Sequence, residues 1–197
     1  MIPSVMFASR NAGKRSEIAR LLTGVIPDVR MLDGAAPDVA ETGETFFDNA
    51  LLKARSAFSV YRMPSLADDS GLTVDALNGD PGVRSARYAG PNASDEDRVR
   101  TLLDAMRGFG HARRYAQFRC TLVLMLSDSL YASFEGIVHG RIMDSPRGKN
   151  GFGYDPIFVP NGYTRTFAEI EADEKNYLSH RGMAVLKCRR FLTRLQG

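Results

Sequence analysis

The sequence has few of the features that mark membrane, secreted or zinc-bound proteins. Its longest purely apolar run, from Leu122 to Leu126, has five residues, whereas a membrane-spanning helix needs about 20. The first residues, MIPSVMFAS, lack the basic start and the small-residue cleavage site of a signal peptide. Cys120 and Cys188 are far apart and lack the paired spacing of a zinc site. We therefore expect a cytoplasmic protein without a membrane partner, in which both thiols are buried and inert.

The composition is that of an ordinary globular chain. The 197 residues are 44% hydrophobic and 25% charged, without repeats, linkers or low-complexity tracts, which suits one domain or two small lobes that share a core. The formal net charge is +3, but the basic residues are scattered apart from Arg113-Arg114 and the stretch from Lys187 to Arg194. That stretch lies at a predicted helix C-terminus, where the helix dipole favours cations. We expect a solvated basic surface, a small polyanionic ligand and no nucleic-acid partner.

The spacing of apolar residues predicts interspersed strands and helices. The predicted strands cover residues 4–9, 29–32, a segment that ends at Asp68, 72–77, 115–126 and 130–142. Helices are predicted from about Gly13, from about Phe47, after a Ser94 cap, and from near Ser179, the last with a stripe of Ala184, Cys188, Phe191 and Leu195. Because 115–126 and 130–142 have the pattern of a hairpin, we expect an α/β protein with a mixed sheet.

Residues 9–14, Ser-Arg-Asn-Ala-Gly-Lys, separate the first predicted strand from the first predicted helix. Amide groups at a helix N-terminus attract phosphate, Asn11 can cap the helix, and Lys14 adds a positive charge. The stretch is not a Walker A loop, because Ala8 stands where that motif needs glycine and Arg15 where it needs Ser or Thr. It indicates a phosphate-binding loop, and an ordinary capped helix start is the alternative.

Two adjacent acids, Asp68 and Asp69, follow an apolar strand and precede Ser70-Gly71. If they end a strand of an open α/β sheet, they border the crevice in which such sheets bind ligands, and strand alternation turns only one of them towards it. A buried acid has to be paired or bound to a metal, and Mg²⁺ takes one or two carboxylates together with water and phosphate. An Asx-type turn is the alternative. Glu41, in the polar loop 33–44, can join this site only if it meets one of these acids in space.

Residues 146–156, PRGKNGFGYDP, place three glycines among aromatic and charged residues. Glycines let a ring approach the backbone, and Phe152 and Tyr154 offer stacking faces, which are worth about 1–3 kcal/mol per base. Asp155 can fix a sugar hydroxyl or orient a neighbour. The stretch indicates a nucleobase-binding loop, and a glycine-rich turn with buried aromatics is the alternative.

Residues 174–181, EKNYLSHR, end in a good N-cap, Ser179, followed by two cationic residues. His180 and Arg181 then lie in the first turn of the last predicted helix, where the dipole disfavours cations unless an anion or an electron-rich group is near. With Lys175 just upstream, this stretch indicates ligand recognition, although a single arginine in a first turn is common. Added to the acid pair, the phosphate loop and the glycine–aromatic loop, it predicts a nucleoside triphosphate site.

These stretches closely resemble those of the bacterial inosine/xanthosine triphosphate pyrophosphatases, house-cleaning enzymes with a Maf/Ham-like fold. The resemblance runs from the first strand to the last helix and rests on SRNAGK, ETGETFFDNALLKA, ADDSGLTVDAL, GVRSARYAG, NGFGYDPIF and EKNYLSHRGMA. It implies a single two-lobed α/β domain over residues 1–197, with a long mixed central sheet flanked by helices and the active site in the cleft between the lobes. It also implies a cytoplasmic homodimer that hydrolyses ITP, dITP and XTP with Mg²⁺ to the monophosphate and pyrophosphate.

The resemblance also implies roles for individual residues. The triphosphate would be bound by the first loop: Ser9, Arg10, Asn11, Ala12, Gly13 and Lys14. Asp69 would be the catalytic acid or base and, with Glu41, a metal ligand. The other substrate contacts would be Ser70, Phe152, Gly153, Tyr154 and Asp155, with Lys175, His180 and Arg181 as the base-recognition set. Arg10 stands where we expect a small residue, which alters the charge of the phosphate loop.

These roles lead to a hypothesis for the reaction and for its selectivity. Mg²⁺ held by Glu41 and Asp69 would neutralise charge on the leaving pyrophosphate, while Asp69 orients or deprotonates a water. Arg181 and Lys175 would donate to the oxygen at position 6 of inosine or xanthosine, and the amino group of adenosine would leave such donors unpaired at about 1–3 kcal/mol each. How GTP is excluded does not follow from the sequence. A nucleotide-binding regulatory module without turnover and an RNA-binding protein are the alternatives, and neither accounts for the acid pair.

Overall fold

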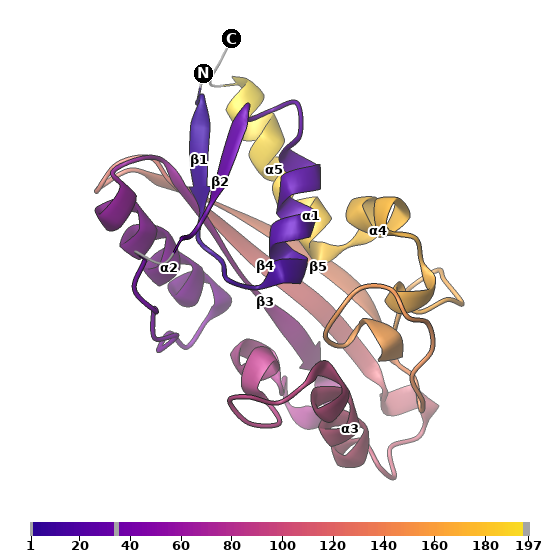
Figure 1. The fold of residues 1–197 in the computed structure, drawn as a ribbon. Coiled ribbons are helices and arrows are strands. Elements are labelled where there is room, and N and C mark those ends of the chain that lie inside the picture. The colour runs from indigo at the N-terminus through magenta and orange to yellow at the C-terminus, as the bar shows by residue number, and fades with distance from the viewer. Residues whose placement is uncertain (1, 34–35, 195–197) are drawn as a thin grey trace. The chain divides into compact units, whose positions relative to one another are not determined.

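The computed structural model of the chain describes residues 2–33 and 36–194 (Figure 1). The strands are β1 (Ser4–Phe7), β2 (Asp28–Met31), β3 (Ser65–Val74), β4 (Tyr115–Met125), β5 (Tyr131–Ile142) and β6 (Phe158–Pro160). The α-helices are α1 (Ala12–Leu22), α2 (Phe46–Tyr61), α3 (Asp95–Ala105), α4 (Ala172–Leu178) and α5 (His180–Arg194). Short 3₁₀ helices are η1 (Asp75–Leu77), η2 (Gly82–Arg87), η3 (His111–Arg113), η4 (Asp155–Ile157) and η5 (Phe167–Glu169).

The six strands form one mixed sheet in the order β2-β1-β3-β4-β5-β6. β1 pairs in parallel with both β2 and β3, whereas β5 and β6 pair antiparallel. β4 and β5 are neighbours, and the tight connection between them is closed by a 2.8 Å hydrogen bond from the Leu126 N–H to the Leu130 carbonyl. The predicted α/β class, the mixed sheet and the pairing of the two long strands are confirmed.

The chain divides into two compact units. Unit 1 contains Met1–Asp69, Cys120–Gly136 and Arg181–Gly197, and unit 2 contains Ser70–Arg119 and Ile137–His180. The boundaries fall inside β3, β4 and β5 and after the first residue of α5. The single two-lobed domain and the cleft between its lobes stay predictions.

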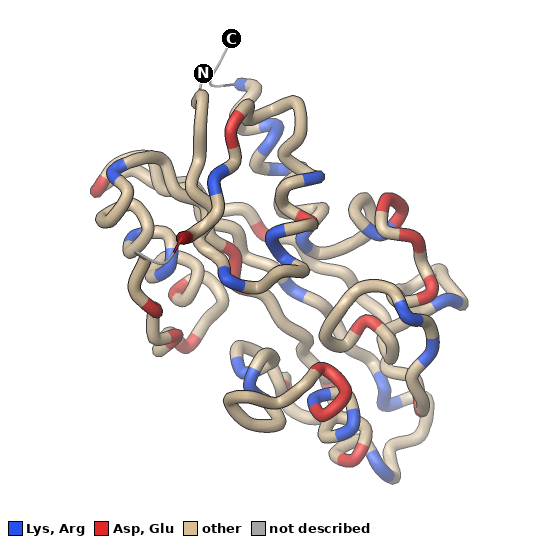
Figure 2. Tube along the Cα trace, in the orientation of Figure 1, with Lys and Arg blue, Asp and Glu red and all other residues tan. Residues whose placement is uncertain are grey.

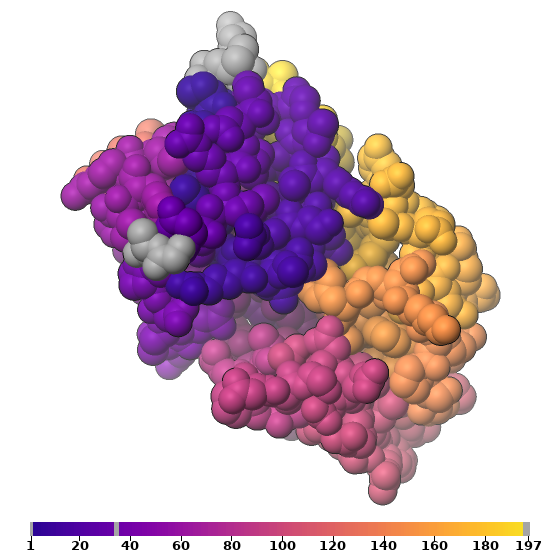
Figure 3. All heavy atoms as spheres, viewed as in Figure 1, coloured from indigo at the N-terminus to yellow at the C-terminus, as the bar shows by residue number. Residues whose placement is uncertain are grey.

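In unit 1, the strands bury apolar side chains on both faces. Val5 and Phe7 of β1 pack with α1 and α5, while Met6, between them, packs with α2 (Figure 1). β3 alternates in the same way, with Leu66 on the α1–α5 face and Ala67 on the α2 face. The space-filling view shows that atoms fill the gaps between the ribbons of β1, β2 and α1 (Figure 3). Because Leu66 and Ala67 already lie on opposite faces of β3, the next two residues, Asp68 and Asp69, also lie on opposite faces.

Unit 2 has its own core, formed by the end of β3, helix α3 and a group of aromatic rings. Leu72 and Val74 pack with Leu102 and Met106 of α3, all fully buried. Phe118 is the centre of the aromatic group, which also contains Phe158 and Phe167. α3 begins at the predicted cap, because the Ser94 hydroxyl and the Asp97 carboxylate form a reciprocal capping box.

The structure corrects the prediction of two strands around ADDSGL. β3 is one continuous strand of ten residues, so Asp68 and Asp69 lie inside it, and the Asx-turn alternative is wrong too. Gly71 is needed for close approach, because a Cβ atom there would lie 2.4 Å from the Ser85 Oγ and 2.5 Å from the Gly82 carbonyl oxygen. α4 is not among the predicted elements, since seven residues are too few for a repeating apolar stripe. Leu195, predicted on the last helix, lies outside the described residues.

The structure also bears on the expectations for the cysteines, the charged residues and membrane-spanning helices. Both cysteines are free and buried, and burial raises the pKa of each thiol, Cys120 and Cys188, to about 12, as expected for inert thiols. Basic and acidic residues are interspersed along the trace (Figure 2). Across residues 2–33 and 36–194, none of the helices combines the length and the apolar content needed to cross a membrane.

Candidate functional site

The predicted phosphate loop connects β1 to α1. The Asn11 side chain caps the helix, because its Oδ1 accepts from the Lys14 N–H at 2.9 Å. The Ser9 Oγ in turn accepts from the Asn11 N–H at 3.3 Å, which keeps the entry to the helix compact. Ala12 and Gly13 are the first two helical residues, so the loop ends at a helix N-terminus, where amide groups attract anions. The predicted cap is confirmed, and phosphate binding stays a prediction.

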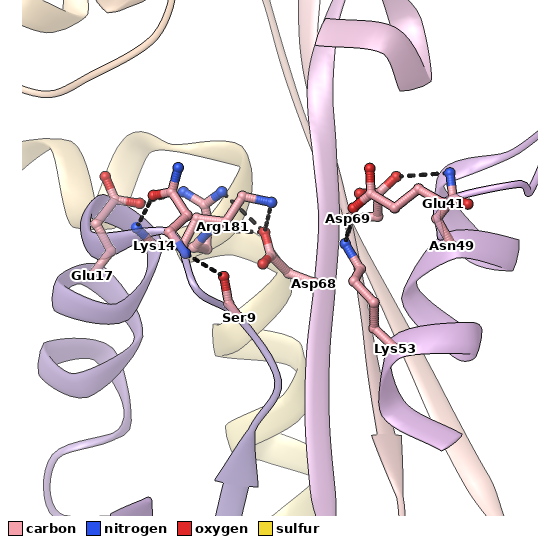
Figure 4. Close-up of polar contacts among 10 residues, drawn as sticks. Ser9, Lys14, Glu17, Glu41, Asn49, Lys53, Asp68, Asp69 and Arg181 are labelled. Carbon is pink, nitrogen blue, oxygen red and sulfur yellow. Dashed lines mark hydrogen bonds and ion pairs between the residues drawn. The ribbon is translucent and has the colours of Figure 1, made fainter. Parts of the chain in front are cut away.

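Asp68 lies on the α1–α5 face of β3, where two cations surround it (Figure 4). One of its oxygens, Oδ2, lies 3.1 Å from the Lys14 Nζ and accepts from the Arg181 Nε and Nη2 at 3.2 and 3.0 Å. Burial alone would raise the pKa of Asp68, but the charges of Lys14 and Arg181 outweigh burial and hold it well below its ordinary range. Asp68 is thus a buried anion whose partners are basic residues.

Asp69 points to the opposite face of β3, towards α2 (Figure 4). The Lys53 Nζ lies 2.8 Å from its Oδ1 and 3.0 Å from the Glu41 Oε1, so a single ammonium bridges the two acids. Asp69 is 4% exposed, and burial raises its pKa above the ordinary value despite the opposing charge of Lys53. The structure therefore brings Glu41 to Asp69, which was the condition for Glu41 to belong to the site.

Helix α2 and the loop before it position these groups. A capping box between Thr45 and Asp48 begins the helix, and Asn49 and Lys53 then lie four residues apart on the face that meets β3. The Asn49 amide donates to the Asp69 Oδ2 at 3.4 Å and accepts from the Gly43 N–H at 2.8 Å. Asn49 therefore ties the loop that carries Glu41 to the strand that carries Asp69.

Sequence reasoning missed three polar residues of these clusters. Asn49 and Lys53 lie within the quoted ETGETFFDNALLKA motif but had no assigned role, because the burial of Asn49 and its contact with Asp69 follow from the fold. Glu17, one turn after Lys14, accepts from the Arg181 Nη1. It had no local signal, because a glutamate on an exposed helix turn is ordinary.

The arrangement of carboxylates fits a hard divalent cation with few protein ligands. Among the described residues, no group of three or more His, Cys, Asp or Glu side chains is arranged to hold a metal. Asp69 and Glu41 nevertheless lie close enough to share one cationic group, the Lys53 ammonium. Mg²⁺ usually binds one or two carboxylates and fills its other positions with water and phosphate oxygens, so this pair meets its needs.

In unit 2, the predicted base-contact residues Phe152 to Asp155 form a tightly bonded turn. The Asp155 Oδ2 accepts from the Phe152 N–H at 2.8 Å and lies 2.6 Å from the Lys175 Nζ. That ammonium also lies 5.1 Å from the centroid of the Phe152 ring. Gly151 has φ +75, and a Cβ there would lie 2.0 Å from the Asp155 Oδ2, so both its backbone and its space require glycine.

Tyr154 has a different environment from Phe152. Its side chain belongs to the core of unit 2, is 3% exposed and donates its hydroxyl to the Ser85 carbonyl at 3.0 Å. The prediction that its ring offers a stacking face is therefore wrong, because the core already covers the ring. A substrate contact of Tyr154 stays a prediction, as does the Ser70 contact. Ser70, half-buried, is the first residue of unit 2.

The three residues of the predicted base-recognition set have separate partners. Lys175 pairs with Asp155, and the His180 ring stacks on Phe118 with 4.7 Å between centroids and 6° between planes. The Arg181 guanidinium donates to the two carboxylates of Asp68 and Glu17. α5 does begin at His180, so both residues lie in its first turn, and the carboxylates of Asp68 and Glu17 offset the unfavourable position of the Arg181 charge. Their role in base recognition stays a prediction.

Arg10, the unexpected residue of the phosphate loop, contacts the loop that leads to Glu41. Its Nη2 donates to the Ala36 carbonyl at 2.6 Å, and its Nε lies 3.0 Å from the Asp38 carboxylate. Its side chain is 54% exposed, so this surface ion pair contributes little stability. A contact of Arg10 with phosphate stays a prediction.

Comparisons with known proteins show which proteins this chain is similar to. The Ham1 family model matches residues 5–191. A dITP/XTP pyrophosphatase from Coxiella burnetii is 44% identical over 192 residues, 96% of each chain, and one from Geobacter sulfurreducens is 46% identical over 183 residues, 92% of each. The solved structure of a HAM1 protein from Coxiella burnetii superposes with a TM-score of 0.88 at 42% identity, covering 97% of this chain and 98% of that one.

Proposed function

This chain belongs to the Ham1 family, and we propose that it hydrolyses the non-standard purine nucleoside triphosphates ITP, dITP and XTP to the monophosphate and pyrophosphate. The observation that carries the proposal is the acid pair bridged by Lys53: Asp69 of β3 and Glu41 of the loop before α2. β3 pairs with β1, which leads to the Asn11-capped helix N-terminus. Relatives at 44–46% identity that are named dITP/XTP pyrophosphatases support the substrate class. Removal of such nucleotides would cleanse the nucleotide pool.

In this proposal, unit 1 supplies the reaction chemistry. Asp69 and Glu41 would hold Mg²⁺, which when bound supplies positive charge to the phosphate oxygens. Asp69 would orient the attacking water and accept its proton, and burial, by raising the pKa of Asp69, makes it a better base than an ordinary aspartate. Lys53, within 3.0 Å of both acids, would add a fixed positive charge where the triphosphate is negative. The amides at the start of α1 would bind the phosphates.

Unit 2 would supply most of the contacts to the nucleobase. Phe152 is half-buried and can stack on a purine, and the buried Lys175–Asp155 pair places an ammonium beside its ring. Lys175, His180 and Arg181 carry the N–H donors that the oxygen at position 6 of inosine and xanthosine can accept. An amino group at that position would leave donors unpaired, which disfavours ATP by about 1–3 kcal/mol for each donor.

Pyrophosphate release from ITP, dITP, XTP, GTP and ATP, measured with and without Mg²⁺, tests the proposal. We expect release from the first three only when Mg²⁺ is present, and a rate with ATP that is lower by about 10²-fold if two donors are left unpaired. Binding of ITP without pyrophosphate release would contradict the proposal and indicate a regulatory nucleotide-binding module. Release of orthophosphate alone would place the cleaved bond elsewhere in the triphosphate.

We also propose a cytoplasmic homodimer without a nucleic-acid partner, following the family resemblance. Apolar surface in unit 1 supports an interface, because Leu130 and Tyr131 at the β4–β5 turn are 58% and 39% exposed. The Tyr131 ring lies 6.0 Å from Phe47 of α2, so this surface continues onto that helix. Light scattering of the wild type and of Tyr131→Lys tests the proposal. A monomeric wild type would contradict it.

A further inference from the structure

A hydrogen bond links α3 to the base loop, which we define as residues 152–155. The Gly153 N–H donates to the Asp95 Oδ2 at 2.7 Å, although the two residues are 58 positions apart in the chain. Asp95 is the first residue of α3, and its other oxygen pairs with the Arg98 guanidinium one turn later. The acceptor is thus a charged carboxylate that is itself held in place, which makes the bond stronger than a neutral one.

The bond to Asp95 links the base loop to α3 at a place where the loop borders a cavity. Gly151 and Gly153 have φ of +75 and +63, a region that glycine reaches easily because it has no Cβ atom, and glycine also has wide backbone freedom when unconstrained. A cavity of about 600 Å³ borders Gly153 and is lined by Val99 and Met106 of α3. Since a cavity borders the loop there, close packing contributes less to the orientation of the 152–153 peptide, and hydrogen bonds contribute more.

The bond to Asp95 fixes the plane of one peptide group. The Gly153 N–H belongs to the same peptide as the Phe152 carbonyl, and that carbonyl accepts from the Asp155 N–H at 3.3 Å. The peptide is therefore held at both ends, and the Phe152 N–H is held by the Asp155 carboxylate as well. The direction in which the Phe152 ring leaves the backbone follows from these bonds, and this ring is the one that Lys175 approaches.

We propose that Asp95 is a positioning residue for nucleobase recognition, which holds the 152–153 peptide so that the Phe152 ring and the Lys175–Asp155 pair meet the purine in a fixed geometry. The inference rests on the proposed function, because only a substrate with a base makes use of this loop. Asp95 does not contact the reacting phosphates in this account. Its loss should therefore change the affinity for the base and the choice between bases more than it changes the chemical step.

Four proteins test the inference: the wild type, Asp95→Ala, Asp95→Asn and Arg98→Gln. We expect Asp95→Ala to raise KM for ITP about tenfold, the order expected for one charge-assisted hydrogen bond, with a smaller change in kcat and a smaller preference for ITP over ATP. Asn keeps an oxygen that can accept from Gly153, so Asp95→Asn should stay within about threefold of the wild type. Arg98→Gln removes the ion pair that helps to hold the Asp95 carboxylate but keeps the acceptor of the Gly153 N–H, so it should raise KM less than Asp95→Ala does.

A purely structural role for Asp95 would give a different result. Loss of folded enzyme would lower the apparent kcat for every triphosphate equally and leave KM and the ITP-to-ATP ratio unchanged, and this outcome would overturn the inference. Equal increases of KM in Asp95→Asn and Asp95→Ala would overturn it too. The defect would then come from the lost negative charge of Asp95 and not from the lost hydrogen-bond acceptor.

Calorimetric binding separates this inference from the proposed function. If the wild type releases no pyrophosphate from any triphosphate, the proposed function fails. Titration of the variants with ITP then tests the role of the Asp95–Gly153 hydrogen bond on its own. Weaker ITP binding by Asp95→Ala than by Asp95→Asn would support the positioning role. Equal binding by the two variants, or no binding by the wild type, would overturn it.

Discussion

Asp68 and Asp69 are neighbours in the sequence, yet the two faces of β3 give them opposite electrostatic surroundings. On the α1–α5 face, two cations, Lys14 and Arg181, meet at a single oxygen of Asp68 and lower its pKa. On the α2 face, the single ammonium of Lys53 forms ion pairs with both Asp69 and Glu41, and the pKa of Asp69 is raised. Burial raises the pKa of both acids. At Asp68 the charges of Lys14 and Arg181 outweigh burial, whereas at Asp69 the charge of Lys53 does not, and the like charge of Glu41 raises the pKa further.

This difference in surroundings suits the two acids to different roles. A carboxylate that two buried cations hold in its ionised form stabilises the fold, and it is poorly suited to gain or lose a proton. A carboxylate that is buried, short of positive charge and next to a second acid attracts a cation and can accept a proton. The comparison therefore predicts that Asp68 mainly determines stability and that Asp69 mainly determines turnover.

The largest expected effect is on turnover. Asp69→Asn should lower kcat for ITP by about 10³-fold, because it removes the proposed base and one metal ligand, and a general base alone contributes 10²–10⁴-fold. The protein should still fold, since a neutral amide costs less to bury than an ionised acid. Steady-state pyrophosphate release and circular dichroism check both parts. A variant that keeps more than about a tenth of the wild-type rate, a loss below ~1.4 kcal/mol, would contradict the assignment.

The next effect is on stability. Asp68→Asn should lower the free energy of unfolding by about 3–5 kcal/mol, because Lys14 and Arg181 would remain partly or wholly buried without their shared anion. Urea denaturation of this variant and of Asp69→Asn, its matched control on the other face, measures the difference. Equal losses of stability in the two variants would remove the distinction between the faces.

The smallest effect is a difference in pH dependence. The folded-state pKa of Asp68 lies below its unfolded value of about 3.9, so its stabilisation is complete above that pH and is lost as the pH falls towards the folded pKa. The stability gap between wild type and Asp68→Asn should therefore narrow below about pH 4. Asp69, with its raised pKa, has the opposite sign, and its ionisation should reduce wild-type stability as the pH rises from about 3.9 through the folded pKa. Urea denaturation at a series of pH values from acid to neutral measures both trends. If the free energy of unfolding of Asp68→Asn and Asp69→Asn changed with pH in the same way, both predictions would be wrong.

Local patterns in the sequence predicted part of this arrangement. The period-two alternation of a strand was enough to place Asp68 and Asp69 on opposite faces, and the Asn11 cap followed from residue type and position. The partners of Asp68 were not predictable in this way. Arg181 is 113 residues away from Asp68, and Glu17 is 164 residues away from Arg181, so the tertiary fold brings them together rather than any local spacing.

The errors have the same physical origin. Ser70-Gly71 has the composition of a turn, but here the glycine makes room for Ser85 and Gly82, a contact that only the fold creates. Lys53 has the pattern of a surface lysine on a helix, and its site role depends on two acids from other segments. Tyr154 has the composition of a stacking residue, and the core of unit 2 covers its ring.

The most direct test of the central claim is a carboxyl-carbon NMR titration of Asp68 and Asp69 in the metal-free protein, repeated with Mg²⁺. We predict that Asp68 stays ionised well below its ordinary pKa, that Asp69 titrates above its own, and that Mg²⁺ shifts only the Asp69 signal at neutral pH. If the two carboxyls titrate together, or if Mg²⁺ perturbs Asp68 rather than Asp69, the division of work between the two faces of β3 is wrong.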